Sequence, residues 1–430
     1  MIGRTNARPV SGPTTFTVNF DSSTFSSGAN LSYADDAAEL TPLDNSHTTG
    51  TVNSSMSWGS WQTLADNPWT KDCYYALIYG DGTEIELNQN DLTKGKDGTD
   101  YSTEITQQNV MFVIPTRYIT RSSAGFTHSR SSSAGSPLAH TIDNTVYSKV
   151  AIGVYPSVVV SNVAKSISGS KPTPNLTRAQ YRTDSKANGN PSNGVWIQWN
   201  IHQYQMIRDM VLASTLKWNS QLYIGKGNLS GSNANNWALN GLYNNKGIFV
   251  GSQSSGSGYA VKAFLENLWG MCYQYVDDVV TGNEYADSGA IWKDVWAGQN
   301  SNPQISVGET DTGAIITSDK VNIGKVYLGP NTGKISGAWK NPKAIGWETS
   351  AGWGLPTLFG GSTSTYTTDG IYVPTVNVSG GVPSTTTARN YVVGGASNGA
   401  QNAGITAMAV DNNVERVSWH GCSRLAFVFD

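Results

Sequence analysis

The chain has 430 residues, of which 38% are hydrophobic and only 14% charged, with a formal net charge of −3 at pH 7. An average globular domain carries about 25% charged residues, so this chain takes its polarity from uncharged Ser, Thr, Asn and Gln. The absence of a Lys/Arg cluster argues against nucleic acid as a partner, and no apolar run approaches the roughly 18 residues of a membrane helix. We therefore expect neither nucleic-acid binding nor membrane insertion. Its 46 glycines and 14 tryptophans favour a strand-rich scaffold with many loops, exposed outside a cell.

The start of the chain and its cysteines bear on where the protein folds. Met1–Pro9 lacks the apolar core of a secretory signal. Cys73, Cys272 and Cys422 are widely spaced, and we interpret them as buried small hydrophobes that form no disulfide framework. These features predict a protein that folds in a reducing cytosol and is exposed later, as a virion component is.

In chain order, residues 1–58 come first and are rich in Ser, Thr and Asn. Only Thr15–Phe20 alternates there as a strand should. We expect this region to lean on a partner chain or a later domain, and to mount the protein on the virion. Residues 59–168 are predicted to form a β-rich middle domain. Its expected strands are Cys73–Tyr79, Val110–Pro115 and Ser148–Tyr155, with a tight turn at Gly80–Gly82.

Residues 169–430 are predicted to form the last domain. The polar stretch Ser166–Asn193 holds three prolines and is typical of a linker or a long surface loop. Apolar residues at helical spacing predict a helix over Ile201–Trp218, with Asp209 and Lys217 elsewhere on the helical wheel. We expect a second helix over Val261–Val279 and then short strands between long loops. The fold class is therefore α+β.

Several motifs, taken in order, carry a family resemblance. They are Leu265–Gly270 (LENLWG) with Tyr273–Asp277 (YQYVD), Gly361–Gly370, and the closing segment Gly394–Phe427. The first resembles the signature of the formylglycine-generating-enzyme branch of the C-type lectin fold. The others are similar to phage and prophage tail receptor-binding proteins of that branch, in many of which the closing segment is rewritten by diversity-generating retroelements. The resemblance spans roughly residues 60 to 430 and implies a C-type lectin-like domain at 169–430.

The resemblance also implies roles for single residues. Trp269 would fill the centre of the domain, while Glu266 and Asn267 side chains would satisfy buried backbone groups. Arg424 would close the last strand against a carboxylate. Formylglycine-type oxidation needs two neighbouring cysteines that bind copper, and Cys422 stands alone in sequence, so we expect no enzyme.

Metal binding has little support in the sequence. The five histidines show no ligand spacing with cysteines, and the sugar-chelating triplets of calcium-dependent lectins are missing. Asp81, Asp97 and Asp369 flank glycines and have the chemistry for structural calcium, but such acids more often cap turns. We therefore predict no metal and no cofactor.

The closing segment offers the best candidate for a binding surface, because adaptable polar side chains on a rigid frame are typical of a paratope. The candidate ligand-binding residues are Ser397, Asn398, Gln401, Asn402, Thr406, Asn412, Asn413, Glu415, Arg416, Trp419 and His420. The plain alternative is that they belong to ordinary solvated loops.

The predicted function is that of a virion tail attachment protein. It would bind a host-cell surface glycan or protein without covalent chemistry. We also expect contacts with other virion proteins and a homo-oligomer, with a trimer favoured, because weak single contacts gain from multivalency. Two alternatives remain open: a structural or capsid-decorating fibre, and a polysaccharide-active enzyme on the same fold.

Overall fold

The computed structural model describes most of the chain. The described residues are 15–20, 31–45, 56–122, 124–229, 231, 233–330, 389–395 and 403–430, with the short strands 334–335, 338–340, 344–347, 356–359, 371–373, 376–379 and 382–383. The protein is mixed but strand-rich, with 14% helix and 38% strand, which is compatible with the expected α+β class. None of the described helices is both long and apolar enough to span a membrane.

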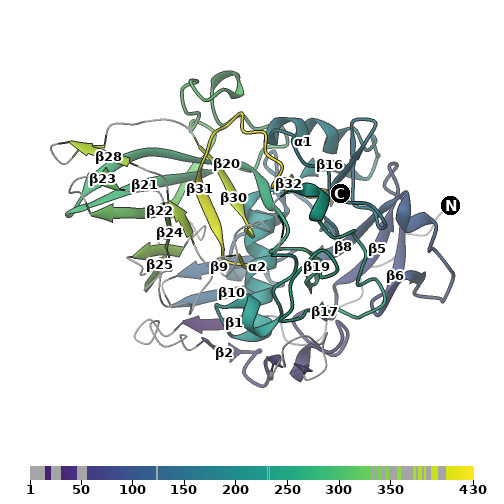
Figure 1. Ribbon diagram of the computed structural model, residues 1–430. Helices are drawn as coiled ribbons and strands as arrows, with labels where there is room; N and C mark the ends of the chain where they lie inside the picture. Colours follow the sequence, from purple (N-terminus) through teal and green to yellow (C-terminus); the bar gives the residue numbers. More distant parts are fainter. Residues whose placement is uncertain are drawn as a thin grey trace.

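A seven-stranded antiparallel sheet forms one part of the core (Figure 1). Its order is β16 (Gly194–Gln198), β33 (Leu425–Phe429), β13 (Lys149–Gly153), β8 (Asn109–Pro115), β5 (Tyr74–Ile78), β6 (Glu84–Asn88) and β7 (Asp91–Gly95). The three strands expected in the middle segment are confirmed as β5, β8 and β13, and the expected turn at Gly80–Gly82 joins β5 to β6. Strands from both sides of residue 168 thus share one sheet.

The second large sheet carries the closing segment of the chain. Its order is β22 (Val321–Pro330), β21 (Ala290–Ala297), β20 (Tyr273–Asp287), β30 (Arg389–Val393), β31 (Met408–Asn412), β27 (Ile371–Val373) and β24 (Ala338–Lys340). A further short strand, β32 (Gly421–Ser423), pairs in parallel with the start of β20. The chain then passes directly from β32 into β33 of the other sheet, so the two sheets are joined at Arg424.

Smaller sheets complete the β structure. A four-stranded sheet has the order β2 (Leu31–Asp35), β1 (Thr15–Phe20), β10 (Gly125–Ser129) and β9 (Tyr118–Ser122). The remaining strands are β3 (Asp44–Asn45), β4 (Met56–Ser57), β11 (Thr141–Ile142), β12 (Thr145–Val146), β14 (Val158–Val160), β15 (Val163–Lys165), β17 (Phe249–Val250), β18 (Lys262–Ala263), β19 (Leu265–Glu266), β23 (Lys334–Ile335), β25 (Ala344–Trp347), β26 (Pro356–Phe359), β28 (Val376–Ser379) and β29 (Val382–Pro383). The strand expected at Thr15–Phe20 is confirmed, and it pairs with β10 of the same chain.

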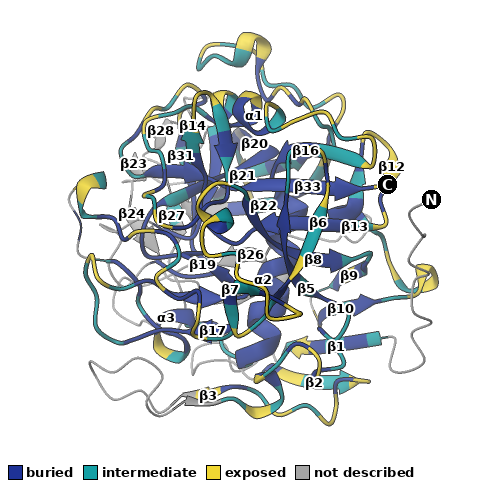
Figure 2. Ribbon diagram, turned by 90° about the vertical axis from the view of Figure 1, so that its right-hand side faces the viewer, coloured by how far each residue is buried: buried dark blue, intermediate teal, exposed yellow. Residues whose placement is uncertain are grey.

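The helix expected from residue 201 is confirmed as α2 (Ile201–Thr215), and all of its residues are buried (Figure 2). It begins at Asn200, whose side chain accepts from the Gln203 backbone N–H while the Gln203 side chain accepts from the Asn200 N–H, a capping box. Asp209 does not face solvent: its carboxylate accepts two hydrogen bonds from Arg121, at 2.9 and 2.6 Å. The Arg121 charge holds the pKa of Asp209 below its usual range, against the opposing effect of burial.

The expected helix over Val261–Val279 is wrong. This segment forms β18, β19 and the first half of β20. Phe264 and Asn267 take positive φ angles of 60° and 56°, which no right-handed helix accommodates. After them, β-branched and aromatic side chains favour an extended strand.

The expected linker Ser166–Asn193 contains a helix that the sequence analysis missed, α1 (Arg178–Lys186). A capping box between Thr177 and Gln180 starts it. A third helix, α3 (Ser220–Tyr223), is a single turn.

Of the three residues expected to organise the interior, Glu266 and Trp269 do so through their side chains. Glu266 accepts hydrogen bonds from the backbone N–H groups of Gly241 and Tyr243, at 2.7 and 3.2 Å. Trp269 is fully buried and its indole N–H donates to the Gly225 carbonyl at 2.9 Å. The expectation for Asn267 is wrong, because its buried side chain has no partner among the described residues. Asn267 instead takes a positive φ angle of 56°, a backbone conformation that Asn adopts more readily than most residues.

Arg424 lies fully buried where the two large sheets meet. Its guanidinium donates to the carbonyls of Gly153 and Val154, both at 2.9 Å, to the Glu266 carbonyl, and to Oε1 of Gln274 at 2.6 Å. The expected carboxylate partner is therefore replaced by backbone carbonyls and an amide. Burial lowers the pKa of Arg424, and the nearby negative charge of Glu266 opposes that shift.

Replacing Arg424 by alanine is expected to destabilise the protein by at least about 3 kcal/mol, because each buried acceptor left unpaired costs about 1–3 kcal/mol. Urea unfolding followed by Trp fluorescence measures the change. Lys96→Ala is the control, because that side chain is 68% exposed and its removal is expected to change stability by less than about 1 kcal/mol. Equal stability of the Arg424→Ala variant and the unmodified protein would contradict the role given to Arg424.

Candidate functional site

The closing segment forms a loop, residues 413–420, between β31 and β32. Within it Asn413 and Glu415 are exposed, and Arg416, Trp419 and His420 are half-buried. Of the other predicted ligand-binding residues, Asn412 is buried at the end of β31 and Thr406 is half-buried in a turn before that strand. Ser397, Asn398, Gln401 and Asn402 lie outside the described residues.

Framework residues from distant segments hold the backbone of this loop. The Asn390 side chain donates to the carbonyls of Asn413 and Val414, at 2.8 and 3.0 Å. The Tyr275 hydroxyl donates to the Arg416 carbonyl at 3.0 Å. These bonds reach main-chain atoms and do not depend on the side chains that the loop displays. The backbone at Asn413, Val414 and Arg416 is therefore held independently of the side chains at the loop surface.

A connection between β21 and β22 supplies a residue that sequence reasoning missed. The Asp311 carboxylate accepts from the backbone N–H of Val414 at 2.6 Å, and the Glu415 carboxylate accepts from the Asp311 N–H at 3.2 Å. Asp311 lies about a hundred residues before the loop, so no local pattern could have identified it. A polar hollow of about 380 Å³ lies here, lined by Asp311, Asn413, Glu415, Arg416, Val417 and Ser418.

A second hollow, of about 230 Å³, shares Arg416 with the first. It is lined by Tyr273, Tyr372, Ala409, Asp411, Asn412, Arg416 and His420. Three of these residues were predicted from the sequence, namely Asn412, Arg416 and His420. The two tyrosines and Asp411 were not, although an aromatic alternation around Tyr273 was visible. The structure thus brings predicted loop residues together with aromatic side chains from two other strands.

Arg416 and His420 form the polar pair of the second hollow. Nη2 of Arg416 lies 2.9 Å from Nε2 of His420. Because a guanidinium only donates, Nε2 accepts, and the imidazole proton lies on Nδ1, which has no partner among the described residues. Burial and the Arg416 charge lower the pKa of His420 to about 4, so the ring is neutral at pH 7.

Asp411 brings the opposite charge to the same hollow. Burial raises the pKa of its carboxyl group, while the positive charge of Arg416 acts against the rise. Its carboxylate accepts no hydrogen bond from another side chain within the described residues. The hollow therefore holds an acceptor and a donor fork that can both reach a ligand.

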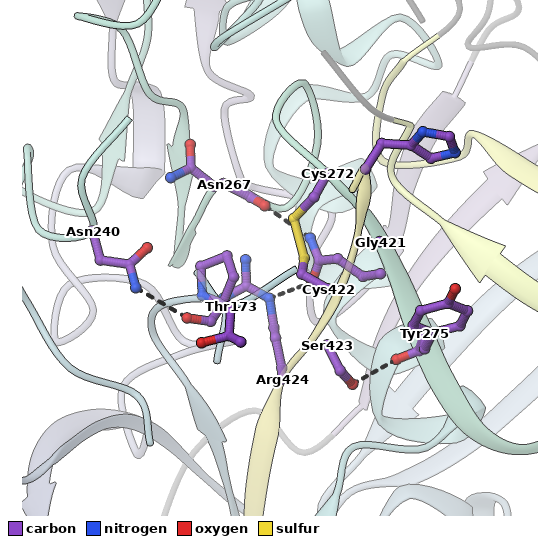
Figure 3. Close-up of a disulfide and its surroundings, with 12 residues drawn as sticks. Thr173, Asn240, Asn267, Cys272, Tyr275, Gly421, Cys422, Ser423 and Arg424 are labelled. Carbon is purple, nitrogen blue, oxygen red and sulfur yellow. Dashed lines mark hydrogen bonds between the residues drawn. A yellow bond between two sulfur atoms is a disulfide. The ribbon is translucent and has the colours of Figure 1, made fainter. Parts of the chain in front are cut away.

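The interpretation of Cys272 and Cys422 as separate thiols is wrong. The two residues form a disulfide, with Cα atoms 6.0 Å apart and a sequence separation of 150 residues (Figure 3). The parallel pairing of β32 with β20 sets Cys422 opposite Gln274, which brings the cysteines together. In the disulfide neither sulfur is a thiolate that could bind copper. Cys73 is buried and free, as expected.

The same strand pairing continues beside the disulfide. Oγ of Ser423 donates to the Tyr275 carbonyl at 2.9 Å (Figure 3). The disulfide also packs among buried Trp237, Ala238 and Met271. The end of the loop 413–420 is thus fixed to β20 by both a covalent bond and hydrogen bonds.

The metal-site predictions concern three aspartates. Asp81 and Asp97 each accept a hydrogen bond from the backbone N–H two residues on, at 2.9 and 3.0 Å, so both cap turns. Asp369 lies outside the described residues. Within the described part of the chain, no group of three or more His, Cys, Asp or Glu residues is placed to hold a metal ion.

Comparison with known proteins identifies no family or relative for this chain. No family model matches the chain, and no curated protein is similar to it. The resemblance drawn from the motifs therefore stays a prediction.

The disulfide is expected to stabilise the oxidised protein by about 2–5 kcal/mol, because it closes a long loop of the unfolded chain. Urea unfolding with and without a reductant measures this difference. The matched control is the Cys272→Ala/Cys422→Ala variant, whose midpoint should not depend on the reductant. Alkylation of three thiols, instead of one, in the denatured oxidised protein would show that the disulfide is not formed.

The pKa of His420 is expected to rise when Arg416 is replaced by glutamine, because one of the two effects that lower it is removed while burial remains. An NMR titration of the imidazole resonances measures the shift, with buried His128 as the internal control. In the folded protein the pKa of His420 lies below the usual 6.5 of a histidine. The contribution of His420 to stability is therefore full above pH 6.5 and is lost as the pH falls towards 4. A normal pKa for His420 in the unmodified protein would contradict the described geometry.

Proposed function

We propose that the protein is a virion attachment protein that binds a host-surface molecule without covalent chemistry through residues 403–430. The observation that carries the proposal is the loop 413–420, whose backbone is held by Asn390, Tyr275 and Asp311 from outside it. Exposed Asn413 is then free to change without loss of the loop conformation, whereas the Glu415 carboxylate also accepts from the Asp311 N–H. A fixed backbone that displays replaceable polar and aromatic side chains is typical of a recognition surface.

We further propose that the chain from 169 to 430 is C-type lectin-like. The support comes from the interior: Glu266 and Trp269 are buried and bonded to backbone groups, as the family resemblance implies. The proposal extends to a homotrimer mounted on a tail through the N-terminal region. Several copies held together would convert weak single contacts into firm attachment.

The triple variant Asn413→Ala/Glu415→Ala/Trp419→Ala is expected to lower binding to host cells at least tenfold, because it removes displayed side chains. It keeps the bonds from Asn390, Tyr275 and Asp311 to the loop backbone and loses only the one from the Asp311 N–H to Glu415. The measurement is binding of fluorescently labelled protein to a panel of bacterial strains. The matched control is Glu86→Ala/Asn88→Ala/Lys96→Ala, on β6 and the turn after β7, far from β31 (Figure 1).

Unchanged binding of the first triple variant to every strain that the unmodified protein binds would refute attachment through this loop. The same preparation incubated with capsular polysaccharide addresses the enzyme alternative. Release of reducing ends in proportion to protein concentration would show that the protein hydrolyses the polysaccharide and does not only attach to it.

A further inference from the structure

We propose that the hollow between Tyr273 and Tyr372 is a calcium-independent subsite for one uncharged pyranose residue of a surface glycan. The inference rests on the proposed attachment function and names the ligand class of its site. It is drawn from the shape, the aromatic walls and the paired charges of this hollow.

The shape suits one small ring. Tyr372 of β27 lies opposite Ala409 of β31 in a parallel pair, and Tyr273 starts β20. The small Ala409 side chain leaves space between two half-buried tyrosines. The volume of about 230 Å³ is below the roughly 300–1,000 Å³ typical of sites for drug-sized ligands. A single sugar unit fits this limit better than a peptide segment does.

The walls suit the apolar face of a sugar. An aromatic ring carries negative charge on its face, and the C–H bonds of a pyranose present positive edges to it. Both tyrosines pack by their inner sides against the cluster of Tyr181, Tyr275 and Val392, which holds the rings in place. Rigid aromatic walls reduce the entropy lost on binding.

The polar groups suit hydroxyls and disfavour a net charge. Asp411 is an acceptor, while Arg416 is a donor whose fork is engaged at Nη2 by His420. A hydroxyl both donates and accepts, so adjacent hydroxyls satisfy this set. An acidic sugar would meet the carboxylate of Asp411, and a cationic ligand would meet Arg416.

The adjacent hollow offers a useful contrast. Its lining includes Asp311, Glu415 and Arg416 but no aromatic ring. It therefore lacks the stacking surface that a sugar ring needs, and the second hollow is the better candidate.

The test uses the full chain with its disulfide formed. Saturation-transfer NMR and isothermal titration are carried out with glucose, galactose, mannose and N-acetylglucosamine, and with N-acetylneuraminic acid as the charged comparison. At least one uncharged sugar is expected to bind at pH 7, with or without a calcium chelator. Asp411→Asn and Tyr372→Ala are each expected to weaken that binding about tenfold or more.

Two further variants test whether the sugar binds in this hollow. Ala409→Leu places bulk between the tyrosines and is expected to abolish sugar binding while leaving the polar groups in place. Asp287→Asn makes the same chemical change as Asp411→Asn at the exposed far end of β20, and is expected to leave sugar affinity unchanged. Near-UV circular dichroism verifies that each variant is folded.

The outcomes separate the two proposals. If the protein binds cells through the loop but binds no uncharged sugar, or binds only the acidic one, the subsite inference is overturned and attachment stands. Full sugar affinity in both Ala409→Leu and Asp411→Asn would also overturn it. If an uncharged sugar binds and these variants lose it while no strain is bound, the subsite stands and the attachment function fails.

Discussion

The buried guanidinium of Arg424 is the interaction on which the rest of the architecture depends. It lies between β32 and β33, and its donors meet the ends of β13 and β19 and a side chain of β20. A buried cation is costly, so it persists because carbonyl dipoles surround it and the negative charge of Glu266 lies nearby. This arrangement fixes where the chain crosses from one sheet to the other. The position of β32, and with it the end of the loop 413–420, follows from that crossing.

The sequence predicted those elements whose pattern is local. Strands such as Thr15–Phe20 alternate within six residues, and the helix from Ile201 repeats apolar residues at helical spacing. The prediction for Val261–Val279 was wrong because the apolar spacing of this segment suits a helix, while the positive φ angles at Phe264 and Asn267 prevent one. Asn267 is of a type that takes positive φ angles more readily than most, but the angle at Phe264 is set by tertiary packing and leaves no mark in the residue type.

The candidate site divides in the same way. Polar residues such as Arg416 and His420 were recognisable because they crowd one loop between glycines and a strand. Tyr372 and Asp311 were not, because each comes from a segment far away that reaches the loop only through strand pairing or a carboxylate–backbone bond. The prediction of separate thiols was wrong for a related reason. Cys272 and Cys422 are 150 residues apart, and nothing in the sequence indicates that they meet until β32 is placed beside β20.

The disulfide has a mechanical consequence. It closes a covalent ring from Cys272 to Cys422, and every residue that lines either hollow lies within that ring. Force applied within the ring reaches the rest of the chain only through Cys272 and Cys422, because the disulfide prevents these two residues from separating. The tension passes at Cys272 and Cys422 to β20 and β32, and from β32 to Arg424. A surface built in this way passes load at its two ends to a covalent bond and to a buried, hydrogen-bonded guanidinium.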